Sequence, residues 1–507
     1  MRKTSVFNKF WVQTMVFFLA LIVIFFFLGY DDVFFLGPHG IHFIRQTDSL
    51  SFASQYFNKS FNFFETRIFN LSSTDGKAAC EFPLTYYITA MLYAVFGKNM
   101  LALKLLHLLI LSLGVYAVFR MSYLLLRDYF YAAAVSLFLL NSTVFNYYAF
   151  NYLPDSPALG FTFLGWYFFY KYQEEKKRNT LSLSFAFFLL GSLIKVTYLI
   201  NPLSILALAF YRLVFNRADA EQRVLTINIL RLGIGLVVIV LSWNIFMLYY
   251  NSLNGSNYFN TSVLPIWDLS RNQINEVWDS MRNYWHTKYF AQSSFHLLFV
   301  IIFFQFVFVK KSNFTLSFLT LLLLLGSLSY FILFYSQFRD HDYYFLAFMP
   351  LVVMFLINGV NILRNITANK YVHIAAKTVL SIVIIAGINY SRMKLTDRNE
   401  IASDMFTKIG FLIQENEKGI EKLNLPLDAK FVVAPDLTPN GGLFFLNRMG
   451  WNIEKAEDIT FAKIKSFKDL GADFLLIDDS SISHVADLEA FGKLIFKGKG
   501  IEIYSLN

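Results

Sequence analysis

The sequence predicts an all-α, polytopic membrane protein with about eleven transmembrane helices and a small α/β domain at its C-terminal end. Only 16% of the 507 residues are charged, whereas 56% are hydrophobic and 59 are phenylalanine. A soluble chain usually carries about 25% charged residues. Apolar runs such as 11–30, 232–250 and 316–335 reach the roughly 20 residues that a helix needs to cross a bilayer core. We therefore place most of the chain in lipid.

The net charge of +9 comes from basic residues that stand in short clusters between the apolar runs. Such clusters fix the topology of a membrane protein, because Lys and Arg are retained in cytoplasmic loops. We therefore predict no nucleic-acid partner. Cys80 is the only cysteine, which excludes an intrachain disulfide and a thiolate metal cluster.

The basic clusters also set the order of the membrane spans. They lie near residues 2–9, 120–127, 171–178, 212–223, 310–311 and 364–370. With all of them inside, the spans alternate without conflict near residues 11–30, 100–122, 129–150, 156–173, 181–197, 198–216, 226–250, 293–309, 314–335, 343–362 and 373–391. The first run lacks a small-residue cleavage site, so we interpret it as an uncleaved span. The N-terminus is then cytoplasmic.

The apolar segment Pro83–Phe96 tests this topology. It has about fourteen residues, too few to cross the bilayer unaided, and counting it as a span would place the later basic clusters outside. We therefore predict an interfacial helix that lies in the headgroup plane and closes a long extracytoplasmic loop, residues 31–99.

The chain is thus predicted to have a transmembrane domain, residues 1–391, and a soluble extracytoplasmic α/β domain, residues 392–507. The second part is less apolar and contains short β-type runs and turn residues. We expect buried strands over 430–434 and 474–477, helices over 441–448 and 463–469, and a terminal hairpin over 493–505 around Gly498 and Gly500.

Ionisable residues at membrane depth are costly and mark functional sites more often than chance. Five separate stretches place such residues at the predicted outer rim: Arg45, Asp48, Glu81, Asp155, Lys195, Arg339, Asp340, His341 and Asp342. We hypothesise that they converge on one pocket. The alternative for any single residue is that it extends to the headgroups or pairs with a neighbour.

Four of these stretches also have a specific structural alternative. Asp48 precedes an amphipathic segment and is a candidate N-cap, whereas Glu81 stands before the helix start at Pro83 and would anchor it at headgroup level. Asp155 suits the N-terminus of a span because of the helix dipole. Lys195 either reaches the headgroups or binds an anion.

Several common catalytic motifs do not occur in the sequence. It contains no Walker A loop, no glycine-rich dinucleotide fingerprint after a strand, no HExxH and no GxSxG. The sequence therefore gives no support for nucleotide hydrolysis or for serine or zinc peptidase chemistry.

The chain resembles the GT-C glycosyltransferases of the family 39 type, which include protein O-mannosyltransferases and the bacterial transferase that adds aminoarabinose to lipid A. The resemblance covers the whole length, and its local matches are Arg45-Gln46-Thr47-Asp48, Glu81-Phe82-Pro83-Leu84-Thr85-Tyr86-Tyr87, Pro154-Asp155, Lys195 and His341-Asp342-Tyr343-Tyr344 ahead of Pro350. Many members have Asp-Glu in the first loop, whereas here Ser49 follows Asp48. This leaves a second carboxylate role to Glu81, to Asp155 or to neither.

The resemblance implies transfer of a sugar from a polyprenyl-phosphate donor to a hydroxyl of a cell-envelope acceptor, which is a lipid, a glycan or a protein. The reaction would invert the sugar carbon and take place at the extracytoplasmic face of the inner (plasma) membrane. No cofactor is required, and a divalent metal is left open. The alternatives are a glycan polymerase or ligase with a lipid-linked donor, and a flippase or transporter of lipid-linked glycans.

The family motif implies Asp48 as the general base. Asp155 and Glu81 complete the catalytic set, because either would orient the acceptor or hold a divalent cation. The residues assigned to substrate binding, with the phosphate foremost, are Arg45, Lys195, Arg339, His341, Asp342 and Tyr343.

The aromatic segment 251–292 contains Tyr284, Trp285 and His286. It is either a lid that closes over bound substrate or an irregular interfacial loop.

Overall fold

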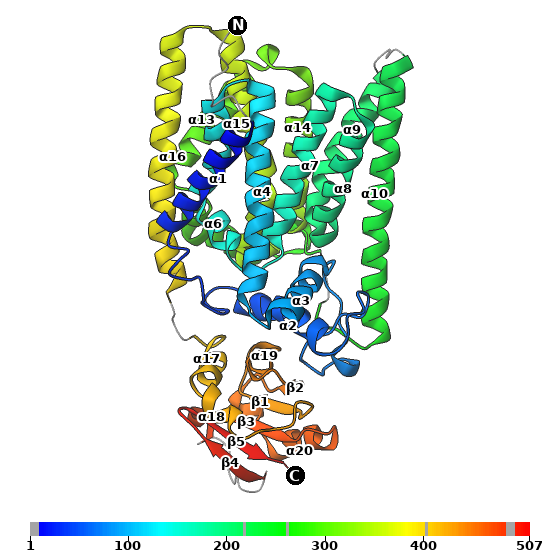
Figure 1. Cartoon of the computed structure of the whole chain (residues 1–507), viewed down its shortest axis with the longest axis vertical. Helices are drawn as coiled ribbons and strands as arrows, with labels where there is room; N and C mark the ends of the chain where they lie inside the picture. The colour runs from blue at the N-terminus through cyan, green and yellow to red at the C-terminus, as the bar shows by residue number, and fades with distance from the viewer. Residues whose placement is uncertain (1–9, 216–219, 260–262, 401–403, 483–491, 507) are drawn as a thin grey trace. The chain divides into compact units, whose positions relative to one another are not determined.

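The computed structural model describes residues 10–506 except 216–219, 260–262, 401–403 and 483–491 (Figure 1). The basic segment 2–9 and parts of 212–223 and of 251–292 lie outside the described residues. The chain divides into two compact units, and we describe each by itself. The helical unit comprises Met1–Phe35, Leu105–Asn244 and Thr261–Arg398, and the loop–sheet unit comprises Leu36–Lys104, Ile245–Asn260 and Asn399–Asn507.

Long apolar helices dominate the helical unit (Figure 1). The α-helices of this unit, long and short, are α1 (Phe10–Phe27), α4 (Leu101–Leu126), α5 (Tyr129–Phe138), α6 (Thr143–Ala149), α7 (Asp155–Glu175), α8 (Arg178–Ile194), α9 (Ile200–Phe215), α10 (Ala220–Leu253), α11 (Arg271–Ser280), α12 (His286–Tyr289), α13 (Gln292–Val307), α14 (Phe314–Leu333), α15 (Met349–Ile366) and α16 (Lys370–Asn399). The ends of α4, α10 and α16 pass into the loop–sheet unit.

Within the described residues, seven helices are long and apolar enough to cross a membrane, or up to nine if each of two bent pairs is one span. The bent pairs are α5 with α6, at 84°, and α11–α12 with α13, at 95°. The prediction of a polytopic helical membrane protein is confirmed, and every predicted span coincides with helix. The count of about eleven stays a prediction, since it requires α7 and the 17-residue α8 to cross as well.

Exposed apolar side chains mark the lipid-facing surfaces of this unit. Trp11 and Phe26 on α1 and Phe299 on α13 each expose about two thirds or more of their surface. Long rows of such residues would be unfavourable in water. In a bilayer core they meet acyl chains, and the helix satisfies its own backbone hydrogen bonds.

The loop–sheet unit combines the loop after α1 with the C-terminal sheet. Its helices are α2 (Phe43–Asn58), α3 (Leu84–Phe96), α17 (Lys408–Glu415), α18 (Glu417–Glu421), α19 (Gly441–Leu446), α20 (Phe461–Asp469) and α21 (Asp479–Ile482). Its strands are β1 (Phe431–Ala434), β2 (Gly450–Asn452), β3 (Phe474–Asp478), β4 (Lys493–Lys497) and β5 (Ile501–Ser505). The helix predicted over 83–96 is present as α3, and its interfacial position stays a prediction.

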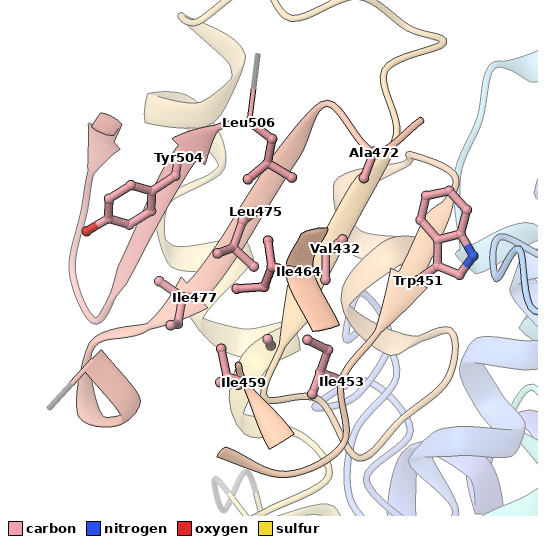
Figure 2. Packing of buried hydrophobic residues seen from close by; sticks show 11 residues of the cluster. Val432, Trp451, Ile453, Ile459, Ile464, Ala472, Leu475, Ile477, Tyr504 and Leu506 are labelled. Atoms are coloured by element: carbon pink, nitrogen blue, oxygen red, sulfur yellow. The ribbon is translucent and has the colours of Figure 1, made fainter. Parts of the chain in front are cut away.

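The five strands form one sheet in the order β2-β1-β3-β5-β4. β1 is parallel to β2 and β3, and the β4–β5 hairpin is antiparallel. Both predicted buried strands, both predicted helices and the hairpin are present. The three-residue β2 was not predicted. Branched and aromatic side chains such as Val432, Ile464 and Leu475 pack on one face of the sheet (Figure 2).

Residues 69–71 of the loop join the sheet beside β2. The amide of Gly450 donates to the carbonyl of Phe69 over 3.1 Å, and the amide of Leu71 donates to the carbonyl of Gly450 over 2.7 Å. A Cβ at position 450 would lie 1.8 Å from the carbonyl oxygen of Phe431, so only glycine fits between these segments. The compact units thus group residues 36–104 with the C-terminal sheet, whereas the predicted domains divide the chain between residues 391 and 392.

Candidate active site

Asp48 lies in the middle of α2 rather than at its start. The helix begins at Phe43 and most of its side chains are buried, so the N-cap alternative for Asp48 is wrong. The carboxylate is 1% exposed. Its Oδ1 accepts from Asn440 Nδ2 at 2.8 Å, and both of its oxygens lie 3.1 Å from the hydroxyl of Tyr258, which donates to them. A buried carboxylate is stable only with donors of this kind.

The surroundings of Asp48 raise the pKa of its carboxyl to about 6. Burial is the largest cause because it penalises the charged form. The charge of Arg45 opposes this effect, as do the hydrogen bonds from Asn440 and Tyr258, whereas the negative charge of Glu81 adds to it. The carboxylate is therefore ionised at pH 7 to 8 and near its midpoint at pH 6, which suits a general base.

Arg45 connects Asp48 to Glu81. Its Nη1 lies 3.5 Å from Asp48 Oδ2, and its Nη2 lies 3.0 Å from both oxygens of Glu81. The thiol of Cys80 and the hydroxyl of Tyr86 also donate to Glu81. Glu81 thus fixes the guanidinium next to Asp48 through charge-assisted hydrogen bonds.

A second cluster lies in the helical unit, where α7 begins and α8 ends. Lys195 Nζ lies 3.2 Å from Asp155 Oδ1 and sits over the rings of Tyr343 and Tyr344, 5.1 and 5.2 Å from their centroids. The hydroxyl of Tyr198 donates to the carbonyl of Asp155. Asp155 is buried, whereas the side chain of Lys195 is 19% exposed. The ammonium group is therefore oriented by a carboxylate and by aromatic faces, and the side chain as a whole keeps some exposed surface.

The hairpin between α14 and α15 divides into residues with different environments. Asp342 is fully buried, and it accepts 2.6 Å hydrogen bonds from Arg398 Nη1 and from the hydroxyl of Tyr148. The ring of His341 packs edge-on against the ring of Tyr343, and their centroids are 5.5 Å apart. Arg339 is half-exposed, and its Nη2 pairs with the neighbouring Asp340 at 2.9 Å.

The predicted site residues thus form two groups, each within one unit. Arg45, Asp48 and Glu81 contact one another in the loop–sheet unit. In the helical unit, Lys195 contacts Asp155 and Tyr343 directly, and His341 joins through its ring. Asp342 is engaged in a buried ion pair with Arg398, and Arg339 is engaged with Asp340. The convergence of all these residues on one pocket stays a prediction.

Three residues that contact the predicted site residues were not singled out from the sequence. Tyr258 and Asn440 are 210 and 392 residues away from Asp48 along the chain, and Asn440 precedes Gly441 in a pattern that indicates only a turn. Arg398 pairs with Asp342 from the end of α16, where a cation indicates no more than a favourable helix C-terminus.

The proposed lid segment is helical over 271–289, so the alternative of an irregular loop is wrong there. A capping box between Ser270 and Gln273 starts α11. The indole of Trp285 donates to the carbonyl of Arg339 over 2.8 Å, which attaches this helix to the hairpin. Closure over a substrate stays a prediction.

Among the residues that the structure describes, no group of three or more His, Cys, Asp or Glu side chains could hold a metal ion. The carboxylates of Asp48 and Glu81 face Arg45, and that of Asp155 faces Lys195. We therefore derive no step through a metal, and the divalent-cation alternative stays untested.

Comparison with known proteins identifies the class of this fold. Residues 79–245 match the model of the family described as dolichyl-phosphate-mannose-protein mannosyltransferase. The structure is similar to that of ArnT from Cupriavidus metallidurans in the apo state, with a TM-score of 0.57, 12% identity and 98% of each chain covered. The chain has the GT-C fold, and its match to a mannosyltransferase family model indicates a glycosyltransferase. The resemblance seen in the sequence is confirmed.

Two solved structures similar to this glycosyltransferase contain lipid phosphates. ArnT from Cupriavidus metallidurans bound to undecaprenyl phosphate matches with a TM-score of 0.58, 12% identity and 98% of each chain covered. The oligosaccharyltransferase AglB from Archaeoglobus fulgidus, in complex with an inhibitory peptide and a dolichol-phosphate, matches with a TM-score of 0.52 and 12% identity. That match covers 94% of this chain and 70% of AglB. No curated protein has a sequence that matches this chain.

The family match covers only a part of the candidate site of the glycosyltransferase. Glu81, Asp155 and Lys195 fall within the matched residues 79–245, whereas Asp48 and the hairpin lie outside them. The roles of these residues therefore rest on their own geometry.

Proposed function

We propose that this glycosyltransferase moves a sugar from a polyprenyl-phosphate donor to a hydroxyl group of a cell-envelope lipid, glycan or protein. The observation that carries the proposal is Asp48, a buried carboxylate that is hydrogen-bonded by neutral donors and has a pKa of about 6. The lipid phosphates in the similar ArnT and AglB structures support the donor class.

The proposed reaction is a single displacement. The acceptor hydroxyl gives its proton to Asp48 while its oxygen forms a bond to the anomeric carbon of the sugar. The bond between that carbon and the phosphate oxygen breaks, its electron pair stays on the phosphate, and polyprenyl phosphate leaves. Attack opposite the leaving group inverts the sugar carbon. Because phosphate is a stable anion, the reaction needs cations near the leaving oxygen more than it needs a strong acid.

Lys195 is the cation that we assign to the donor phosphate. It is partly exposed and oriented by Asp155, and it adjoins the rings of Tyr343 and Tyr344. Asp155 then acts by holding the ammonium group in place. Glu81 does the same for Arg45, whose guanidinium stabilises the ionised form of Asp48.

We place the reaction at the extracytoplasmic face of the inner membrane, with the N-terminus in the cytoplasm. The clusters of Lys and Arg between the apolar runs support this orientation.

The direct test uses the purified enzyme in lipid nanodiscs with undecaprenyl-phosphate sugars that differ only in the sugar. We expect undecaprenyl phosphate to be released when an envelope extract supplies the acceptor. Mass spectrometry measures this release. Glycolipids and glycoproteins that lose one sugar in a deletion strain would identify that acceptor.

The same assay separates the alternatives. A flippase moves the intact donor and releases no lipid phosphate, whereas a polymerase or ligase extends a lipid-linked glycan. Use of a nucleotide sugar in place of the lipid donor would contradict the proposal.

A further inference from the structure

The C-terminal part of the chain contributes a side chain to the Asp48 carboxylate. Asn440 stands in the turn between β1 and α19, and its Nδ2 donates to Asp48 Oδ1 over 2.8 Å. Both side chains are buried. A buried hydrogen bond to an ionised acceptor is stronger than one in water, and it fixes the direction of the carboxylate.

The amide of Asn440 can take only one orientation at this position. Its Oδ1 accepts the backbone N–H of Asn70 at 3.1 Å. Because an amide has its acceptor and its donors on opposite sides, this bond leaves Nδ2 facing Asp48. Asn70 itself donates from its side chain to the carbonyl of Pro439 and to Asn452 Oδ1, at 2.8 and 2.9 Å.

The turn that carries Asn440 is held in one conformation. The carboxylate of Asp436 accepts from the amides of Thr438 and Gly442, at 2.8 and 2.9 Å. A Cβ at Gly441 would lie 2.2 Å from Thr438 Oγ1, and one at Gly442 would lie 2.7 Å from Asp436 Oδ2. The two glycines therefore permit a packed turn that supports Asn440.

We propose that Asn440 is a positioning residue for the general base, which makes the α/β sheet a part of the catalytic machinery rather than a separate domain for acceptor recognition or for covering the site. This inference rests on the proposed role of Asp48. Asn440 acts through Asp48 and is not itself assigned a contact with substrate.

The charge balance around Asp48 gives the direction of the effect. Arg45 contacts Asp48 from α2, Tyr258 contacts it from the segment after α10, and Asn440 contacts it from the turn before α19. Glu81 acts through Arg45. Burial raises the pKa of Asp48, whereas the bond from Asn440 lowers it. Without that bond the carboxyl takes up its proton at a higher pH.

Two substitutions at one position test the inference. Asn440→Ala removes the donor. Asn440→Asp also removes the donor but retains an acceptor for the amide of Asn70, and it adds a negative charge next to Asp48. We expect the acid limb of the kcat–pH profile to move upward by about one pH unit in Asn440→Ala, because a hydrogen bond to a charged group contributes this much, and further in Asn440→Asp. Turnover at pH 6 should fall roughly fivefold in Asn440→Ala, because the ionised fraction drops from about one half to about one tenth, and it should recover at pH 8.5.

Asn447→Ala is the matched control. Asn447 follows α19 and accepts from Asn58 and Lys98, away from Asp48. Its pH profile should equal that of the wild type. A purely structural role for Asn440 predicts that Asn440→Ala loses stability but has the wild-type midpoint, and that result would overturn the inference.

A further variant separates this inference from the proposed function. If Asp48→Asn abolishes transfer and the Asn440 variants retain the wild-type midpoint, only the role of Asn440 is wrong. If Asp48→Asn retains full turnover, the assignment of Asp48 as the general base is wrong. The role proposed for Asn440 is then wrong as well.

Discussion

Two buried carboxylates of this glycosyltransferase, Asp48 and Asp342, have opposite surroundings. Asp342 accepts 2.6 Å hydrogen bonds from Arg398 and Tyr148. Asp48 has a cation only at 3.5 Å, and Glu81 binds the same cation more closely. Removal of one partner from a close, buried ion pair leaves an uncompensated charge and destabilises the fold. A carboxylate with a distant, shared cation retains affinity for a proton. The comparison supports our proposal that Asp48 takes up the proton, and from it we propose a structural role for Asp342.

The largest expected effect is the loss of turnover in Asp48→Asn. The amide cannot accept the acceptor's proton, and general-base catalysis contributes about 10²- to 10⁴-fold. We expect kcat to fall by about that factor while donor binding and thermal unfolding stay close to those of the wild type. Initial rates of undecaprenyl phosphate release measure the effect, with Asp342→Asn as the partner variant, which should lose stability instead.

Arg398→Ala tests the structural role proposed for Asp342. It leaves the Asp342 carboxylate buried without its cation, which costs about 3–5 kcal/mol of stability. We expect a marked drop in the midpoint of thermal unfolding in detergent. The double variant Arg398→Met with Asp342→Leu should recover much of that loss, because no unpaired charge remains. Unchanged unfolding of Arg398→Ala would remove the structural assignment.

Lys195→Ala should weaken donor binding while the fold stays intact. A charge-assisted contact to phosphate contributes about 1.5–3 kcal/mol, which corresponds to roughly tenfold to a hundredfold in affinity. Competition with a polyprenyl phosphate measures the change. Lys195→Arg, which retains a cation, should recover part of the affinity. An unaltered inhibition constant in Lys195→Ala would contradict the phosphate assignment.

The smallest expected effect is the pH dependence of turnover in the wild-type enzyme. A general base works in its ionised form, so turnover should be complete well above the Asp48 pKa of about 6 and fall as the pH drops through that value. Below the midpoint the fall is about tenfold per pH unit. Measurements of kcat between pH 5 and 8.5 test this, with stability followed in parallel. A flat profile down to pH 5 would contradict a general base with this pKa.

The membrane helices were predictable because crossing a bilayer requires only length and apolar composition, and every predicted span coincides with helix. Arg45 and Asp48 were also found from sequence, since ionisable residues at membrane depth are costly and mark functional sites. The start of α2 was missed because polar residues 45–49 obscure its apolar pattern. Tyr258 and Asn440 reach Asp48 from distant segments, and no local pattern specifies such pairs.

The loop residues 69–71 have a consequence for the solubility of the sheet. An unpaired edge strand is a template for aggregation with another molecule. Here one edge, β2, is occupied by the bridge from Asn70 to Gly450. The other edge, β4, carries the exposed cations Lys493 and Lys497, which repel a second strand of the same kind. With both edges protected, the extracted enzyme should resist β-type self-association even when detergent replaces lipid.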